Sequence, residues 1–175
     1  IGSKLYRFLE QGFSTKDVLT ELDGMPVVAL GYVQDIERHT PEAYKSLVAG
    51  CEKMCDIAEQ LGCDTVQLLT GPIGPGICDF DGYMGVTGKP WKEIRDLTSK
   101  NLKVLADIAA KHGIRFYLEP LTWTPLHTLA QTLELIEVTG KDNIGLVIDF
   151  WHMWTSGVTP DEVAKLDKNL IYGAH

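Results

Sequence analysis

Three side chains with metal-binding chemistry, Glu119, Asp149 and His175, each follow a short apolar segment of this 175-residue chain. The stretch between one and the next is about as long as one strand–helix unit. Because equivalent positions of neighbouring parallel strands meet at one edge of a sheet, we expect these three side chains to converge there. Two carboxylates and an imidazole form a ligand set that suits Mn²⁺, Mg²⁺, Co²⁺ or Zn²⁺. The sequence therefore predicts a shared site for one divalent metal ion.

Each of these residues, taken alone, also has an ordinary structural explanation. A carboxylate just past a strand often caps the next helix. A histidine beside tryptophans, such as His152, is usually a packed or hydrogen-bonded side chain, and His175 alone indicates little. The metal-site prediction depends on finding three ligand types after three consecutive apolar segments.

Apolar segments alternate with amphipathic ones along the chain. The apolar segments are short and continuous, as expected for strands buried on both faces of a parallel sheet. The predicted strands are Val27–Leu30, Val66–Leu69, Phe116–Leu118, Leu146–Ile148 and Leu170–Tyr172. The predicted helices span about 15–22, 41–61, 90–111, 126–138 and 160–166, each with capping or stop residues at its ends. This alternation predicts an α/β fold, either an open doubly wound sheet or a (β/α)₈ barrel.

The segment 71–90 contains six glycines and three prolines and follows a predicted strand. Its opening Gly-Pro-Ile-Gly-Pro-Gly is neither the dinucleotide fingerprint nor a Walker loop, so it does not support the open nucleotide-binding sheet. We predict a long active-site loop at the ligand end of the sheet, with a disordered insertion as the alternative.

The overall charge limits the choice of partner. Lys and Arg number 16 against 24 Asp and Glu, which gives a net charge of −8. An acidic chain is a poor candidate for nucleic-acid binding, and no apolar run is long enough for a membrane span. The four cysteines form no Cys-x-x-Cys pair and are interpreted as small buried residues in a reducing compartment, which predicts a cytoplasmic location.

Three motifs resemble one known family. Tyr117–Pro120 (Tyr-Leu-Glu-Pro), Val147–His152 (Val-Ile-Asp-Phe-Trp-His) and Ile171–His175 (Ile-Tyr-Gly-Ala-His) are similar to the xylose-isomerase-like TIM-barrel superfamily. Within it, the sugar phosphate isomerase/epimerase group is the nearest match, which includes inosose isomerases and dehydratases, hydroxypyruvate isomerases and ketose 3-epimerases. The resemblance extends from about Met25 onward, and the Asp-x-x-His step is its most specific part.

The resemblance implies roles for the matching positions. Glu119 would be both a metal ligand and one of two catalytic carboxylates, at the end of the fifth barrel strand. Asp149 and His175 would be ligands from the sixth and seventh strands, and His152 would contact substrate oxygens. The family's fourth ligand, a glutamate on the eighth strand and the second acid/base, has no match before His175.

Two further residues are candidate substrate contacts. Gln67 lies in the Gln-Leu-Leu-Thr-Gly strand end, which also fits the family. Trp123, with Trp151 and Trp154, lies close to the strand ends in sequence and would form an apolar wall. Ordinary packing of the tryptophans is the alternative.

The implied fold is a TIM barrel, which typically needs about 250 residues. We therefore predict that 1–175 forms one incomplete barrel domain with about strands 3 to 7. An open barrel exposes its edge strands and core, so association into a homo-oligomer is expected.

The implied function is that of a divalent-metal-dependent isomerase or epimerase. Its substrate would be a sugar, sugar phosphate, inosose or small hydroxy-keto compound, and its chemistry proton transfer through an enediolate; a dehydratase stays open. Pro125 stands where ketose 3-epimerases usually have a glutamate, which weakens the hypothesis that the chain is an epimerase. The alternatives are an apurinic-endonuclease-like metal nuclease and a truncated, non-catalytic barrel that acts as a binding or assembly module. The predicted partner is a small sugar or polyol-derived molecule, with no nucleic acid and no membrane.

Overall fold

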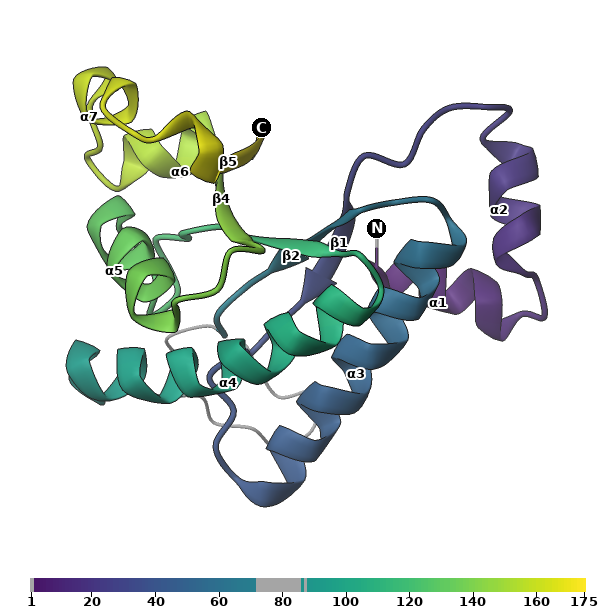
Figure 1. Cartoon of the computed structure of the whole chain (residues 1–175), viewed down its shortest axis with the longest axis horizontal. Helices are drawn as coiled ribbons and strands as arrows, with labels where there is room; N and C mark the ends of the chain where they lie inside the picture. Colours follow the sequence, from purple (N-terminus) through teal and green to yellow (C-terminus); the bar gives the residue numbers. More distant parts are fainter. Residues whose placement is uncertain (1, 72–85, 87) are drawn as a thin grey trace.

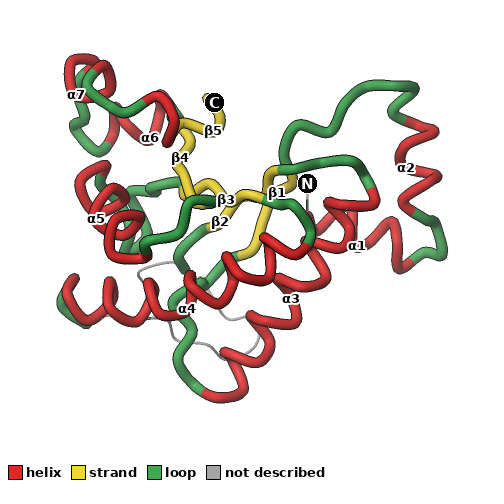
Figure 2. The backbone as a smooth tube through the Cα atoms, in the orientation of Figure 1, coloured by secondary structure: helices red, strands yellow, loops and turns green. Residues whose placement is uncertain are grey.

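The computed structural model describes residues 2–71, 86 and 88–175 (Figures 1 and 2). Its sheet consists of β1 (Leu30–Val33), β2 (Thr65–Leu68), β3 (Arg115–Leu118), β4 (Ile144–Ile148) and β5 (Ile171–Ala174). All neighbouring strands are parallel, and they lie in the sheet in chain order. This arrangement confirms the predicted α/β class and the prediction of about five parallel strands.

Among the described residues, two of the helices precede β1, and the others lie between strands along the chain. The helices are α1 (Gly2–Glu10), α2 (Thr15–Glu21), α3 (Pro41–Gln60), α4 (Trp91–Lys111), α5 (Leu129–Thr139), α6 (Phe150–Thr155), α7 (Pro160–Ala164) and the 3₁₀ turn η1 (Lys168–Leu170). Helix α3 packs on β1 and β2, α4 on β3 and α5 on β4, and α4 contacts both α3 and α5. Figure 1 shows these three helices following one another beside the strands.

Side chains alternate between the two faces of the strands, as they must in extended backbone. Val66, Leu68, Phe116, Leu118, Leu146 and Ile148 are buried in the apolar core shared with the helices. The intervening positions, which include Gln67, Tyr117 and Val147, face the opposite side of the sheet. That second face carries the polar residues, and it continues into Glu119, Asp149 and His175 beyond the strand ends.

The first strand lies three residues later than predicted, the fourth helix starts three residues later, and the other bounds differ by at most two residues. The first strand starts at Leu30, not Val27, because Leu30 pairs with Val66 of β2 whereas Val28 is 77% exposed. Helix α5 starts at Leu129, not 126, because Thr128 and Gln131 form a capping box that fixes its first turn. Helices α1 and α6 were not predicted from the sequence.

The predicted loop, the cysteines and the absence of a membrane span can also be compared with the structure. Most of the predicted active-site loop 71–90 lies outside the described residues, as does Cys78, whereas Cys51, Cys55 and Cys63 are buried free thiols. None of the helices in the described part of the chain has the length and apolar character that crossing a membrane requires.

Gly145 allows β5 to lie close to β4. A Cβ atom at this position would come within 2.5 Å of the Leu170 carbonyl oxygen and 2.9 Å of the Tyr172 ring. We expect Gly145→Ala to lower the free energy of unfolding by about 1–3 kcal/mol, because backbone must move to admit the methyl group. Denaturant unfolding measures this change.

Gly50→Ala is the matched control. Gly50 lies within α3, and a Cβ there meets nothing within 4 Å. This substitution should raise the free energy of unfolding by about 0.5–1 kcal/mol, since alanine favours the helix. Equal effects of the two substitutions would contradict the crowding at Gly145.

Candidate metal centre

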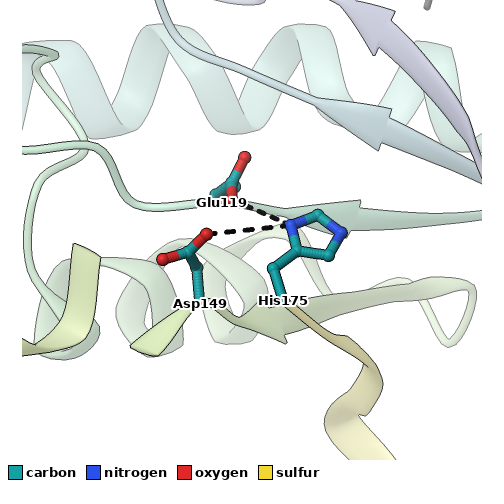
Figure 3. A group of neighbouring side chains, drawn as sticks. All are labelled: Glu119, Asp149 and His175. Carbon is teal, nitrogen blue, oxygen red and sulfur yellow. Dashed lines mark hydrogen bonds and ion pairs between the residues drawn. The ribbon is translucent and has the colours of Figure 1, made fainter. Parts of the chain in front are cut away.

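The sheet brings Glu119, Asp149 and His175 to one place (Figure 3). They follow β3, β4 and β5, three neighbouring parallel strands whose carboxyl ends lie at one edge. The backbone N–H of Glu119 donates to the Leu68 carbonyl at 3.4 Å, and that of His175 donates to the Ile148 carbonyl at 2.9 Å. The sheet's own hydrogen bonding therefore extends to two of these residues.

The three side chains each offer a ligand atom, and these atoms lie within 4.8 Å of one another. His175 Nδ1 is 3.3 Å from Glu119 Oε1 and 3.9 Å from Asp149 Oδ2. The Glu119 and Asp149 side chains are 7% and 17% exposed, while that of His175 is 44% exposed. The cluster thus has a buried base and one open side.

This donor set fits a divalent cation. Nitrogen and oxygen ligands bind Zn²⁺ at about 2.0–2.2 Å, which places neighbouring ligand atoms about 3–3.5 Å apart. The Glu119–His175 separation of 3.3 Å already has this value, and the Asp149–His175 separation of 3.9 Å is slightly wider. All three ligand atoms lie within 4.8 Å of one another, so the Asp149 carboxylate would move inward to complete the arrangement around a shared ion.

Asp149 has a second structural task. Its Oδ1 accepts a hydrogen bond from the backbone N–H of His152 at 2.9 Å, so Asp149 is the N-cap of α6. Its Oδ2 is the atom that faces His175. The capping explanation considered for a lone carboxylate therefore holds here together with the metal-ligand geometry, because the two oxygens do different things.

Gln67 and Tyr117 lie next to Glu119 on the same face of the sheet. Gln67 and Tyr117 are paired across β2 and β3, and Gln67 Nε2 donates to Glu119 Oε2. The Tyr117 ring lies edge-on to His175 with ring centroids 5.9 Å apart. Burial, and then the nearby Glu119 carboxylate, raise the pKa of Tyr117 to about 12, so its phenol is neutral beside the site. Tyr117 was missed in the sequence, although its place two residues before Glu119 puts it on the same strand face.

His152 and Trp123 lie together beside the cluster. Their rings meet edge to face with centroids 5.1 Å apart, and Trp123 is 50% exposed. Among the described residues, the buried His152 Nδ1 has no hydrogen-bond partner. Trp151 and Trp154 also project from α6 and are exposed, with ring centroids 6.1 Å apart.

A second buried carboxylate lies past the end of β1. Glu37 is fully buried, and its two oxygens accept from the Gly71 N–H at 2.9 and 3.1 Å. A Cβ at position 71 would overlap Asp35 and lie 2.7 Å from Glu37 Oε1, so any side chain there would force both carboxylates to move. Burial raises the pKa of Glu37 to about 7. Sequence reasoning missed this residue because nothing in its spacing marks it as buried.

A family comparison agrees with this fold. The family model for xylose isomerase-like TIM barrels matches residues 15–175. The chain therefore belongs to the xylose isomerase-like TIM barrel family, as its strand-end motifs indicated.

Particular relatives narrow the comparison. The chain is similar to an inosose isomerase of Halalkalibacterium halodurans (32% identical over 85 residues, 47% of this chain and 30% of the relative). It is also similar to a 3-dehydroshikimate dehydratase of Bacillus anthracis (29% identical over 115 residues, 66% of this chain and 39% of the relative). Among solved structures, the zinc-bound IolI protein superimposes with a TM-score of 0.83 at 20% identity, over 98% of this chain and 59% of that one. The 3-keto-D-glucoside 4-epimerase of E. coli gives 0.68 at 22% identity, over 92% and 63%. The matched segments thus cover between about a third and two thirds of these relatives.

The two tasks of Asp149 can be separated by substitution. Asp149→Asn keeps a short N-cap acceptor but loses the charge, so we expect Mn²⁺ affinity to fall at least about tenfold while thermal stability stays close to wild type. Asp149→Ala should lose the affinity and also about 1 kcal/mol of stability. Calorimetric titration and thermal unfolding measure the two effects. Unchanged Mn²⁺ affinity in both variants would remove Asp149 from the centre.

The buried Glu37 carboxyl makes stability depend on pH. Its folded-state pKa of about 7 lies above the usual glutamate pKa of 4.5, so its contribution to stability is complete below about pH 4.5 and is lost as pH rises through about 7. Relative to Glu37→Gln, the wild-type free energy of unfolding should therefore fall by on the order of 3 kcal/mol between pH 5 and pH 8. Denaturant unfolding across this range checks it. Glu52→Gln, at an exposed position of α3, should leave the pH profile unchanged, and parallel profiles for the wild type and Glu37→Gln would refute the prediction.

Proposed function

We propose that this chain carries the metal-binding centre and one catalytic carboxylate of a divalent-metal-dependent isomerase, epimerase or dehydratase. Its substrate would be a sugar, inosose or similar small polyhydroxy carbonyl compound. The observation that carries the proposal is the convergence of Glu119, Asp149 and His175 from three neighbouring strands. The relatives named as inosose isomerase and 3-dehydroshikimate dehydratase support the choice of reaction class.

Glu119, Asp149 and His175 would hold the cation, with Mn²⁺, Mg²⁺, Co²⁺ or Zn²⁺ as candidates. When bound, such a cation supplies a Lewis acid that stabilises negative charge on the substrate's carbonyl oxygen. The open side of the cluster, where His175 is 44% exposed, is where the substrate would approach.

Glu119 would act as the base. One of its oxygens takes the proton from the carbon next to the carbonyl; the C–H bond breaks, and its electron pair forms the double bond of an enediolate. Return of a proton to the opposite face of that carbon gives epimerisation, and return to the neighbouring carbon gives isomerisation. Loss of a hydroxyl group as water from the next carbon gives dehydration. All three outcomes share this first step, in which Glu119 would be the base.

His152 and Trp123 are the proposed substrate contacts beside the cluster. The buried His152 Nδ1 atom lacks a partner in the described part of the chain, and a substrate hydroxyl that reached it would supply one. The half-exposed Trp123 ring next to it offers an apolar surface that excludes water. We further propose that the substrate is small and either neutral or anionic. The protein would act in the cytoplasm and would associate through the edge strands of its sheet.

The proposed step is tested by hydrogen exchange from D₂O. We expect the Mn²⁺-loaded chain to catalyse incorporation of deuterium next to the carbonyl of at least one of an inosose, a ketohexose or 3-dehydroshikimate, read by mass spectrometry. Glu119→Gln should slow this exchange by about 10²-fold or more, because the base is removed. Glu137→Gln, at an exposed position of α5, should have no effect.

The rival functions give different results in the same preparation. Cleavage of DNA containing abasic sites, without deuterium incorporation, would favour the metal nuclease instead. Mn²⁺ binding without either reaction would favour the non-catalytic barrel and contradict the proposed enzyme.

A further inference from the structure

We propose that Gln67 is a positioning residue that makes Glu119 a one-oxygen ligand and thereby favours small divalent cations over Ca²⁺. This inference rests on the proposed function, because it concerns the same metal centre. It assigns Gln67 a task in holding Glu119, whereas the sequence predicted only a substrate contact, which stays a prediction.

The sheet register places Gln67 within reach of Glu119. Gln67 of β2 pairs with Tyr117 of β3, and Glu119 follows two residues later on the same face. Strands lie about 4.8 Å apart and rise about 3.3 Å per residue, so such diagonal neighbours are about 8 Å apart, a distance that a glutamine side chain can bridge. Its Nε2 donates to Glu119 Oε2. Because a carboxylate can only accept, the amide nitrogen must face Glu119 and the amide oxygen must face away.

Gly31 of β1 provides the space for the amide oxygen. A Cβ atom at position 31 would lie 2.6 Å from Gln67 Oε1, too close for any side chain to coexist with the present position of the amide. The Gln67 amide is therefore held between β1 on one side and Glu119 on the other. Three neighbouring strands fix the orientation of one carboxylate.

This orientation divides the work of the two Glu119 oxygens. Oε2 accepts from Gln67, while Oε1 lies 3.3 Å from His175 Nδ1, on the side where the cation would be shared. Only 7% of the Glu119 side chain is exposed, so water cannot easily replace the amide as the partner of Oε2. Glu119 would consequently bind a cation through Oε1 alone.

One-oxygen binding has a consequence for metal choice. Ca²⁺ takes six to eight oxygen ligands at about 2.3–2.6 Å, often from carboxylates that bind with both oxygens. Mg²⁺ and Zn²⁺ bind at about 2.0–2.2 Å with fewer or more strictly placed ligands. A Glu119 carboxylate that cannot turn its second oxygen toward the ion should therefore discriminate against Ca²⁺.

The test is calorimetric titration of the full chain with Mn²⁺ and with Ca²⁺. Gln67→Met keeps the length of the side chain and removes the donor, and we expect it to weaken Mn²⁺ binding about tenfold or more and to narrow the preference for Mn²⁺ over Ca²⁺. The matched control is Gln60→Met, since Gln60 Nε2 also donates to a carboxylate, Asp56 Oδ2 at 2.9 Å, at the exposed end of α3. It should change neither affinity.

A second variant tests the same contact without removing the amide. Gly31→Ala should displace the Gln67 amide and weaken Mn²⁺ binding in the wild-type background. In a Gln67→Ala background, where nothing is left to displace, the added Gly31→Ala change should have no further effect. Circular dichroism of each variant confirms that the fold is retained.

The outcomes separate the two proposals. The role of Gln67 would be overturned if Gln67→Met and Gly31→Ala both kept the wild-type Mn²⁺ affinity and metal preference. If Glu119→Gln lost Mn²⁺ binding in the same experiment, the metal centre itself would remain supported. Absence of Mn²⁺ binding by the wild type, or full binding by Glu119→Gln, would overturn the metal centre and the role of Gln67 with it.

Discussion

Parallel pairing of β3, β4 and β5 is the constraint on which the rest of the structure depends. Glu119, Asp149 and His175 are far apart in the sequence and come within ligand distance only because their strands run in the same direction and end at one edge. The backbone hydrogen bonds that Glu119 and His175 make to neighbouring strands extend this alignment beyond the last residue of each strand. The centre is therefore built by the sheet itself, and the loops around it can vary without moving it.

The two faces of the sheet have different roles, since one packs the apolar core and the other leads to the candidate site. Alternate residues pack into the apolar core beneath α3, α4 and α5, while those between them, which include Gln67 and Tyr117, form the face that leads to Glu119, Asp149 and His175. Because strand side chains alternate, a shift of one residue in any strand would exchange the two sets. The buried core therefore fixes which residues reach the centre. On the other face, Gly31 leaves room for Gln67 and Gly145 leaves room for Tyr172.

Much of this arrangement could be predicted from the sequence, for identifiable reasons. Continuous apolar segments mark buried parallel strands, and three ligand types at successive strand ends mark a shared site. What could not be predicted depends on contacts between distant residues. Helix α6 was missed because its aromatic residues, exposed in the structure, give no amphipathic pattern. The hydrogen bond from Gln67 to Glu119 depends on the register between β2 and β3, and the burial of Glu37 depends on the backbone of Gly71.

The divided carboxylate of Asp149 joins two parts of the protein that would otherwise be independent. One oxygen holds the first turn of α6 and the other faces His175, so the order of that helix and the charge at the strand ends share a single side chain. Phe150, Trp151 and Trp154 project from this helix into solvent. A cation bound at Oδ2 would therefore change the charge on the same side chain that caps α6, the helix from which these aromatic residues project.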